Sequence, residues 1–244
     1  AFGTGDLILA DGVTVGQYGS INNPNQSGNS QLDRSLVNNI QVNGNIKFGT
    51  GSYASHLGGN IDLKGANRTI TLGNTTHLYG QVSNGGLVVD NGNVDGTDRT
   101  LALYVSNNYA GGTVVRTNAA LAVGHDKALG SGSVVYTNTS SSAGYATLRA
   151  STLSTAANQL RTIANDIGIS TNMTMKVISV TTAQDAAGTD VAVNVDTVLS
   201  GQISGQGGLT KEGANKVTLT GNNSYTGATT VAAGNLTVNG SIAN

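Results

Sequence analysis

Residues 222–231 read Asn-Asn-Ser-Tyr-Thr-Gly-Ala-Thr-Thr-Val, and residues 107–115 read Asn-Asn-Tyr-Ala-Gly-Gly-Thr-Val-Val. Each of these similar stretches continues into a second short apolar segment, at residues 235–238 and 119–123 respectively. Around the later copy, runs near 216–220, 228–231 and 235–238 fit within about 23 residues, the length expected of one coil of a solenoid. The repetition therefore predicts short strands that stack coil upon coil.

The composition of the 244-residue chain suits such a stack. Its 35 glycines allow sharp corners, and asparagine is the polar residue that best tolerates a left-handed corner. Hydrophobic residues make up 38% of the chain and aromatic residues only 4%, which favours a narrow interior filled by aliphatic side chains. We therefore expect an all-β fold.

The same style of sequence continues through the first hundred residues. Short apolar and threonine-rich runs lie between clusters of Gly, Asn and Asp, at 6–10, 39–42, 60–64, 68–72, 87–90 and 99–105. In 61–64 and 69–72, apolar and polar residues alternate, which places every second side chain on a buried face. These runs predict strands with one face towards a core and one towards water.

Residues 153–167 allow two interpretations. The apolar residues with the i, i+3, i+4, i+7 spacing of a helix face are Leu153, Ala156, Ala157, Leu160, Ile163, Ala164 and Ile167. Ser151 or Thr152 could cap the start of a short helix, and Gly168 could end it. Alternatively, residues 161–169 form a strand of the stack whose isoleucines face inward. The sequence leaves both the helix and the strand open.

The later repeat begins upstream of residue 222, where the similarity to residues 107–115 starts. Residues 201–213 read Gly-Gln-Ile-Ser-Gly-Gln-Gly-Gly-Leu-Thr-Lys-Glu-Gly, and residues 216–227 read Lys-Val-Thr-Leu-Thr-Gly-Asn-Asn-Ser-Tyr-Thr-Gly. This stretch resembles the passenger-associated transport repeat of bacterial autotransporters, with its G-G-L-T-K-x-G and N-x-Y-T-G elements. It departs from the family only at variable sites, with Glu212, Asn215 and Ala228. Residues 107–134 are similar too, including Ala-Leu-Gly-Ser-Gly-Ser-Val at 128–134.

The resemblance implies a passenger segment folded as a right-handed parallel β-helix. The repeat-like units span about 107–134 and 201–238, and we expect residues 1–244 to form a single β-solenoid segment of a longer precursor. In the family, a C-terminal outer-membrane β-barrel of the same precursor secretes the passenger. The resemblance therefore also implies an extracellular or cell-surface location on a Gram-negative bacterium.

Charge and cysteine content argue against several classes of partner. The formal net charge is -1, and no run of Lys or Arg could neutralise successive phosphates, so we expect no nucleic-acid partner. Without cysteine, the chain has neither disulfides nor thiolate metal ligands. No motif predicts a cofactor.

The densest group of potential oxygen ligands is the stretch Asp-Asn-Gly-Asn-Val-Asp-Gly-Thr-Asp at residues 90–98. Oxygen-rich, glycine-rich loops of this kind can hold Ca²⁺. Counted from Asn91 as an EF-hand-like loop, however, the twelfth position is Ala102 rather than a bidentate glutamate. We therefore expect a turn here, with Ca²⁺ binding as the alternative.

No arrangement of histidines or carboxylates predicts catalysis. The histidines lack metal-ligand spacing, and we expect all three in exposed loops: His56, His77 and His125. A triad would require His125 or His77 beside Asp126 or Asp62, and no serine has a G-x-S-x-G context. A glycosidase or lyase would need paired carboxylates on one face, and Asp62, Asp90 and Asp95 could align only if their coils were in register. We expect scattered, solvated aspartates instead.

Tyrosines could contact sugars or partner surfaces. They are Tyr18, Tyr53, Tyr79, Tyr104, Tyr109, Tyr136, Tyr145 and Tyr225, and we expect them to be exposed apart from those at repeat positions. Tyr109 and Tyr225 hold the same repeat position, so we expect both to pack at coil corners. Threonine pairs at 75–76 and 229–230 form no T-x-T array at coil spacing, so an ice-binding face is not predicted.

The resemblance, with no catalytic arrangement beside it, predicts a non-enzymatic adhesin or self-association scaffold. Rows of Asn, Thr and Ser side chains would make many weak hydrogen bonds. The expected partners are a host surface protein or glycan, or another copy of the passenger. Two alternatives stay open: the scaffold of a toxin or enzyme whose active domain lies outside this segment, and a repeat that aids secretion and folding.

Overall fold

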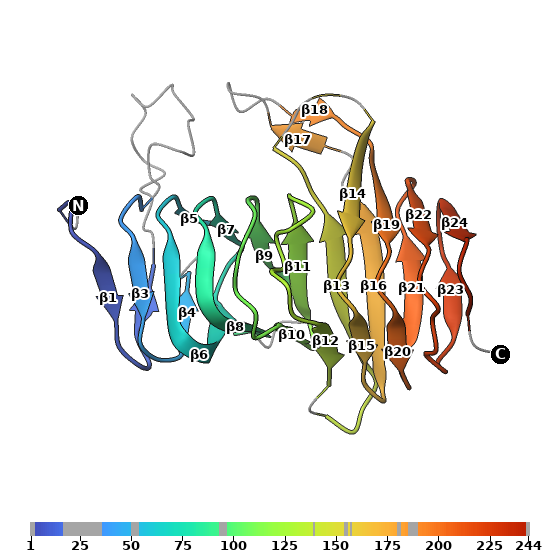
Figure 1. Ribbon diagram of the computed structural model, residues 1–244, viewed down its shortest axis with the longest axis horizontal. Coiled ribbons are helices and arrows are strands. Elements are labelled where there is room, and N and C mark those ends of the chain that lie inside the picture. Colours follow the sequence, from blue (N-terminus) through green and yellow to red (C-terminus); the bar gives the residue numbers. More distant parts are fainter. Residues whose placement is uncertain are drawn as a thin grey trace.

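The computed structural model describes residues 3–16, 36–49, 54–92, 97–138, 140–153, 156, 158–179, 182–184 and 190–242. Every regular element in these residues is a strand, and the strands stack into an elongated parallel β-helix (Figure 1). The described residues contain no helix that is long and apolar enough to cross a membrane. The predicted all-β solenoid is confirmed, and the right-handed sense of the coil stays a prediction.

Sheet A runs along most of the stack, with its strands hydrogen-bonded in parallel. Its described strands are β1 (Leu7–Leu9), β2 (Thr14–Val15), β3 (Ile40–Val42), β4 (Ile46–Phe48), β6 (Ile61–Leu72), β8 (Val82–Asn91), β10 (Thr113–Arg116), β12 (Val134–Thr137), β15 (Ile167–Ile169) and β20 (Ile203–Gly205).

Sheets B and C form the other walls and are also parallel. The described strands of sheet B are β5 (Ser55–Leu57), β7 (Thr76–Leu78), β9 (Arg99–Leu103), β11 (Ala119–Val123), β13 (Gly144–Ala150), β16 (Met173–Ser179), β21 (Gly208–Glu212) and β23 (Thr229–Val231). Those of sheet C are β14 (Gln159–Ile163), β19 (Val195–Leu199), β22 (Lys216–Leu219) and β24 (Asn235–Val238).

One antiparallel pair is inserted between β16 and β19. It consists of β17 (Thr182–Gln184) and β18 (Asp190–Ala192), drawn at the top of Figure 1. The insertion lengthens its coil. Lys216 N donates to Asp196 Oδ1 across 20 residues, whereas Gln202 N donates to Asp166 Oδ1 across 36 residues that include the hairpin. The regular coil is thus close to the expected length, and longer coils carry insertions.

The core is built from columns of in-register aliphatic side chains. In sheet B, Leu101, Leu121, Leu148 and Val177 follow one another on successive strands, and each is at most 1% exposed. Burial of one such side chain contributes about 1.5–3 kcal/mol. Because each column crosses many coils, a coil is stabilised mainly by the coils on either side of it.

The long strands β6 and β8 bend around a corner without ending. Lys64 and Gly65 in β6 have positive φ, as do Asn84 and Gly85 in β8. The Oδ1 atom of Asp62 accepts hydrogen bonds from Lys64 N (2.8 Å) and from Asn84 Nδ2 (3.2 Å). One carboxylate therefore fixes the bends of two neighbouring coils.

The helix considered for residues 153–167 is wrong in the described residues, which leave out 154, 155 and 157, and the strand expected over 161–169 is present as two strands separated at 164–166. Residues 159–163 form β14 and residues 167–169 form β15, with Ile163, Ile167 and Ile169 at most 2% exposed. Leu160, which the helix would have buried, is 56% exposed. The backbone of these strands finds partners in β19, β12 and β20, so neighbouring coils override the local helical spacing.

Candidate functional site

The repeat's lysine, Lys211, lies inside the coil rather than on its surface. It occupies the inward column of sheet B and has no exposed area. Its Nζ atom donates hydrogen bonds to the carbonyl oxygens of Glu212 (2.9 Å), Gly213 (2.6 Å) and Ala233 (3.0 Å). Burial lowers the pKa of Lys211, and the charge of Asp196 opposes that shift. The ammonium group closes a corner by satisfying carbonyls from two successive coils.

In both repeats, a tyrosine hydroxyl is bonded to the threonine four residues later. Tyr109 OH lies 2.8 Å from Thr113 Oγ1, and Tyr225 OH lies 2.6 Å from Thr229 Oγ1. Both tyrosines are at most 1% exposed and lie in the segments between strands that precede β10 and β23, so they are buried inside the coils. Burial raises the pKa of Tyr109, and the hydrogen bond with Thr113 opposes the rise. These two tyrosines therefore stabilise the interior of the coils and offer no surface for a sugar.

Asparagines at one shared repeat position join three coils. Asn107 Oδ1 accepts a hydrogen bond from Val82 N (2.7 Å), and Asn107 Nδ2 donates to Ala128 O (2.6 Å). Asn223 makes the same two kinds of bond, to the coil before it and the coil after it. The polar side chains that define the repeat are thus engaged within the stack.

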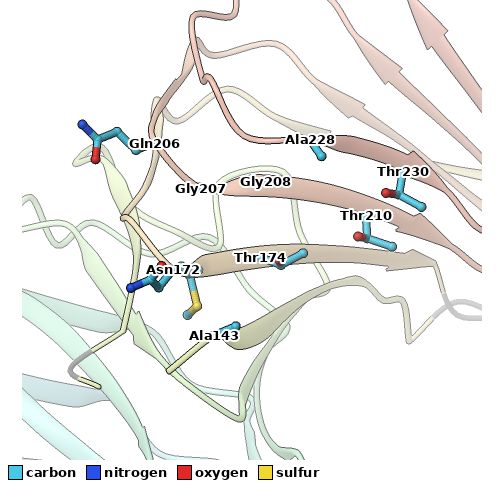
Figure 2. Close-up of a pocket in the computed structure, with 10 residues that line it drawn as sticks. Ala143, Asn172, Thr174, Gln206, Gly207, Gly208, Thr210, Ala228 and Thr230 are labelled. Atoms are coloured by element: carbon cyan, nitrogen blue, oxygen red, sulfur yellow. The ribbon is translucent and has the colours of Figure 1, made fainter. Parts of the chain in front are cut away.

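A shallow pocket of about 250 Å³ lies on the outer face of sheet B, towards its C-terminal end (Figure 2). Thr174 on β16, Thr210 on β21 and Thr230 on β23 line it from three successive coils. Thr210 and Thr230 are direct register partners, and Figure 2 shows their side chains one above the other. Thr174 is in register with Gly208 rather than with Thr210, so the pocket presents a short, offset row of three hydroxyl groups.

The remainder of the pocket is neutral as well. Asn172 and Gln206 line one end, where Gln206 Oε1 accepts a hydrogen bond from the Thr171 hydroxyl. Beside Asn172 and Gln206, Gly207 and Gly208 form a backbone surface without side chains (Figure 2). A Cβ atom on Gly207 would lie only 2.4 Å from the carbonyl oxygen of Met173, so glycine is required there. The pocket combines hydroxyl, amide and backbone groups without a charge.

Charged groups beside the pocket are paired with one another. Tyr145 is the register partner of Thr174, and Lys176 Nζ lies 3.9 Å from the centroid of the Tyr145 ring. Lys176 also pairs with Glu212, with Nζ and Oε1 3.4 Å apart. An aromatic ring with a neutralised cation therefore flanks the hydroxyl row.

A second cluster lies further towards the N-terminus of sheet B. It comprises His56, His77, Tyr79 and Tyr104, called here the ring stack. The two imidazole rings are stacked with centroids 4.6 Å apart and planes within 3°. His56 Nδ1 lies 3.1 Å from Tyr79 OH, and His77 Nδ1 lies 2.9 Å from Tyr104 OH. The stack joins side chains from three successive coils.

The prediction that His56 and His77 lie in exposed loops is wrong. Both lie on strands and are direct register partners, and His56 is only 6% exposed. A signal for this pairing was present, because Ser55-His56-Leu57 and Thr76-His77-Leu78 are similar tripeptides one coil apart. His125 does lie in a loop, where its Nδ1 accepts a hydrogen bond from Lys127 N (3.0 Å).

The oxygen-rich stretch 90–98 is only partly described, because Asn93, Val94, Asp95 and Gly96 lie outside the described residues. Asp90 pairs with Arg116 at 2.7 Å. Asp98 Oδ2 accepts a hydrogen bond from Thr147 Oγ1 (2.9 Å) and lies 3.8 Å from Arg149. In the described part of the chain, no group of three or more His, Asp or Glu side chains could hold a metal ion.

The candidate carboxylates do not come together in the described coils. Asp62 is in register with Ser83 and Asp90 with Thr71, so the two carboxylates sit at opposite ends of β6 and β8. Asp126 pairs with Arg161 at 3.0 Å. Within the described residues, Asp62, Asp90 and Asp126 each have a charged partner close by, and Asp95 lies outside the described residues.

The other tyrosines fall into different environments. Tyr136 is completely buried, so the expectation that it is exposed is wrong. It points inward because it lies between Val115 and Ile169 in an inward column of sheet A. Tyr18 and Tyr53 lie outside the described residues.

Comparison with known proteins identifies the repeat. The family model of the passenger-associated-transport-repeat matches residues 99–123 and 209–238. Both matches overlap the units expected from the sequence, although the first begins and ends earlier. A search of curated proteins and a search of solved structures each gave no match.

Proposed function

Because the chain carries two passenger-associated transport repeats of an autotransporter passenger region, we propose that it is a non-enzymatic adhesive scaffold. Such repeats imply a secreted or cell-surface protein. In this proposal, the stacked coils hold the outer face of sheet B towards a neutral glycan on a host surface. A second copy of the passenger is the alternative partner.

The observation that carries the proposal is the pocket in Figure 2. Its lining offers three threonine hydroxyls and two side-chain amides over a bare glycine surface, with no charged group. Hydroxyl and amide groups can each donate and accept hydrogen bonds, which matches the many hydroxyls of a sugar. Each neutral bond contributes about 1 kcal/mol net, so affinity would come from several bonds and from many passengers on one surface.

The test removes the hydroxyl row while keeping the shape of the strands. The variant Thr174→Val, Thr210→Val, Thr230→Val retains β-branched side chains and loses three hydroxyls. We expect its binding to an array of neutral oligosaccharides to fall at least about tenfold, because three hydrogen bonds of about 1 kcal/mol each are lost. Surface plasmon resonance on the best-bound sugar gives the dissociation constant.

A matched control changes threonines on a different wall. Thr69 and Thr71 lie half-buried on β6 of sheet A, and Thr69→Val, Thr71→Val should leave sugar binding unchanged. Unchanged binding in the pocket variant would contradict the proposal. Loss of cell clumping without any loss of sugar binding would favour self-association instead.

A second candidate role is supported by the repeat itself. Because the side chains of Lys211 and Asn223 are engaged inside the stack, the repeat is suited to stabilising the emerging coils during secretion. Lys211→Met removes three hydrogen bonds to backbone carbonyls, at a cost of about 2–4 kcal/mol. We expect less passenger on the cell surface per precursor made, measured by antibody labelling of intact cells.

The exposed lysine of the same repeat provides the control for this experiment. The side chain of Lys216 is 50% exposed, and Lys216→Met should leave export unchanged. Sugar binding per exported molecule should be the same for wild type and Lys211→Met. Equal export of the two lysine variants would remove the support for a folding role.

A further inference from the structure

We propose that the ring stack is an acid-sensitive latch, which holds the coils of β5, β7 and β9 together near neutral pH and loosens them in acid. The latch is separate from the pocket, because β11 and β13 lie between β9 and β16 in sheet B. It gives the passenger a response to pH that its proposed adhesive role does not require.

The geometry ties three coils through one cluster of rings. The imidazole of each coil is bonded through Nδ1 to a tyrosine of the following coil, at 3.1 Å for His56 and 2.9 Å for His77. The Tyr79 and Tyr104 rings are themselves stacked, with centroids 5.2 Å apart. Separation of β5 from β7, or of β7 from β9, must therefore break a ring contact and a hydrogen bond together.

The packed rings favour neutral imidazoles. Nδ1 of a neutral imidazole can accept the tyrosine proton or donate its own, according to the tautomer, whereas an imidazolium can only donate to the phenol oxygen. Protonation of both rings would also place two positive charges face to face, with ring centroids 4.6 Å apart. Burial raises the pKa of Tyr79, and burial followed by the charge of Tyr79 raises that of Tyr104 to about 12. Neither phenol therefore supplies a compensating negative charge.

Among the described residues, the titratable groups whose rings contact the two imidazoles are each other, Tyr79 and Tyr104. On the next strand, β9, the residue in register with His77 is Ala102, which cannot titrate. Burial lowers the pKa of His56. Burial, and then the charge of His56, lowers the pKa of His77 to about 4.

The direction of the pH effect follows from these lowered pKa values. A histidine in an opened coil titrates near 6.5, so between pH 6.5 and about 4 the opened state binds more protons than the closed state. The latch is therefore fully stabilising above pH 6.5 and loses strength as the pH falls towards 4. Opening should become about ten times more favourable per pH unit, roughly two orders of magnitude across the window.

Hydrogen exchange of the full chain, followed by mass spectrometry at pH 7.0, 6.0, 5.0 and 4.5, measures this opening locally. After correction for intrinsic exchange, we expect protection of peptides covering β5 and β7 to fall about 30-fold or more between pH 7.0 and 4.5. Peptides covering β16 and β21 should change less than about threefold, because the ring stack does not touch them.

The variant His56→Phe, His77→Phe keeps two stacked rings and removes both titratable groups. We expect protection of its β5 and β7 to be nearly independent of pH over this range. The control His125→Gln should keep the wild-type pH response, because His125 lies in a loop outside the ring stack.

Two results would overturn the latch: no pH response of β5 and β7 in the wild type, or an equal response in the phenylalanine variant. If that variant does not fold at pH 7.0, NMR titration of the wild-type imidazoles decides. A midpoint of His77 below about 5.5, with the pKa of His56 also lowered, supports the latch, and midpoints at or above 6.5 for both refute it.

Discussion

Polar side chains at the coil corners are used to join coils. A backbone N–H of an adjacent coil donates to the Oδ1 atom of each of Asn39, Asn60, Asn107, Asp166 and Asp196. Each such hydrogen bond contributes about 1 kcal/mol net, so these contacts add stability where the strand ladders are interrupted, and most at the buried Asn107. Because these oxygens are engaged internally, the threonine hydroxyls of sheet B are the better candidates for contact with a partner.

Asn107 provides the clearest stability test at the scale of one residue. Asn107→Ala leaves Val82 N and Ala128 O without their side-chain partner in a nearly dry site, where Asn107 is 6% exposed. We expect the free energy of unfolding, measured in urea, to fall by about 2–4 kcal/mol. Asn108→Ala, at the exposed neighbouring position, should cost less than about 0.5 kcal/mol. Equal effects of the two substitutions would show that the amide bridge is not stabilising.

Among the elements, alternation of apolar and polar residues predicted strands well where a coil is short. The predicted runs at 60–64 and 68–72 both became strand, and they are the two ends of β6, which bends at Lys64 and Gly65. The sequence did not reveal this continuity because a corner residue with positive φ looks like a turn. The helix considered for residues 153–167 was wrong because the strand that pairs with β14 lies 36 residues further along the chain. A local spacing of apolar residues cannot report a partner at that distance.

The candidate sites were less predictable than the strands. Thr210 and Thr230 are register partners one regular coil apart, but Thr174 reaches the same pocket across the longer coil, where it lies opposite Gly208. Spacing along the sequence therefore could not place Thr174 beside the other two threonines. The pairing of His56 with His77 needed only one regular coil of 21 residues, and its repeated tripeptide could have indicated it. The register between strands of neighbouring coils depends on residues far apart in the sequence. A single sequence therefore indicates this register only where the coils carry no insertions.

In the whole molecule, the described coils are stacked in parallel and in register. Each coil contacts its neighbours, so stability and pH response can differ along the stack. This arrangement lets the ring stack loosen one region while the pocket on β16, β21 and β23 stays formed. In the proposed folding role, the repeat at 209–238 would stabilise the coils beside it.

The most direct test of this stacking is a pair of distances along one outward column of sheet A. Thr69, Val88, Val114, Val135, Gly168 and Ser204 are successive register partners in that column. The chain has no cysteine, so spin labels on Thr69→Cys, Ser204→Cys attach only there. With a strand spacing of about 4.8 Å, double electron–electron resonance should give roughly 24 Å for this pair and roughly 19 Å for Val88→Cys, Ser204→Cys. A Thr69 distance equal to or shorter than the Val88 distance would contradict the parallel stack.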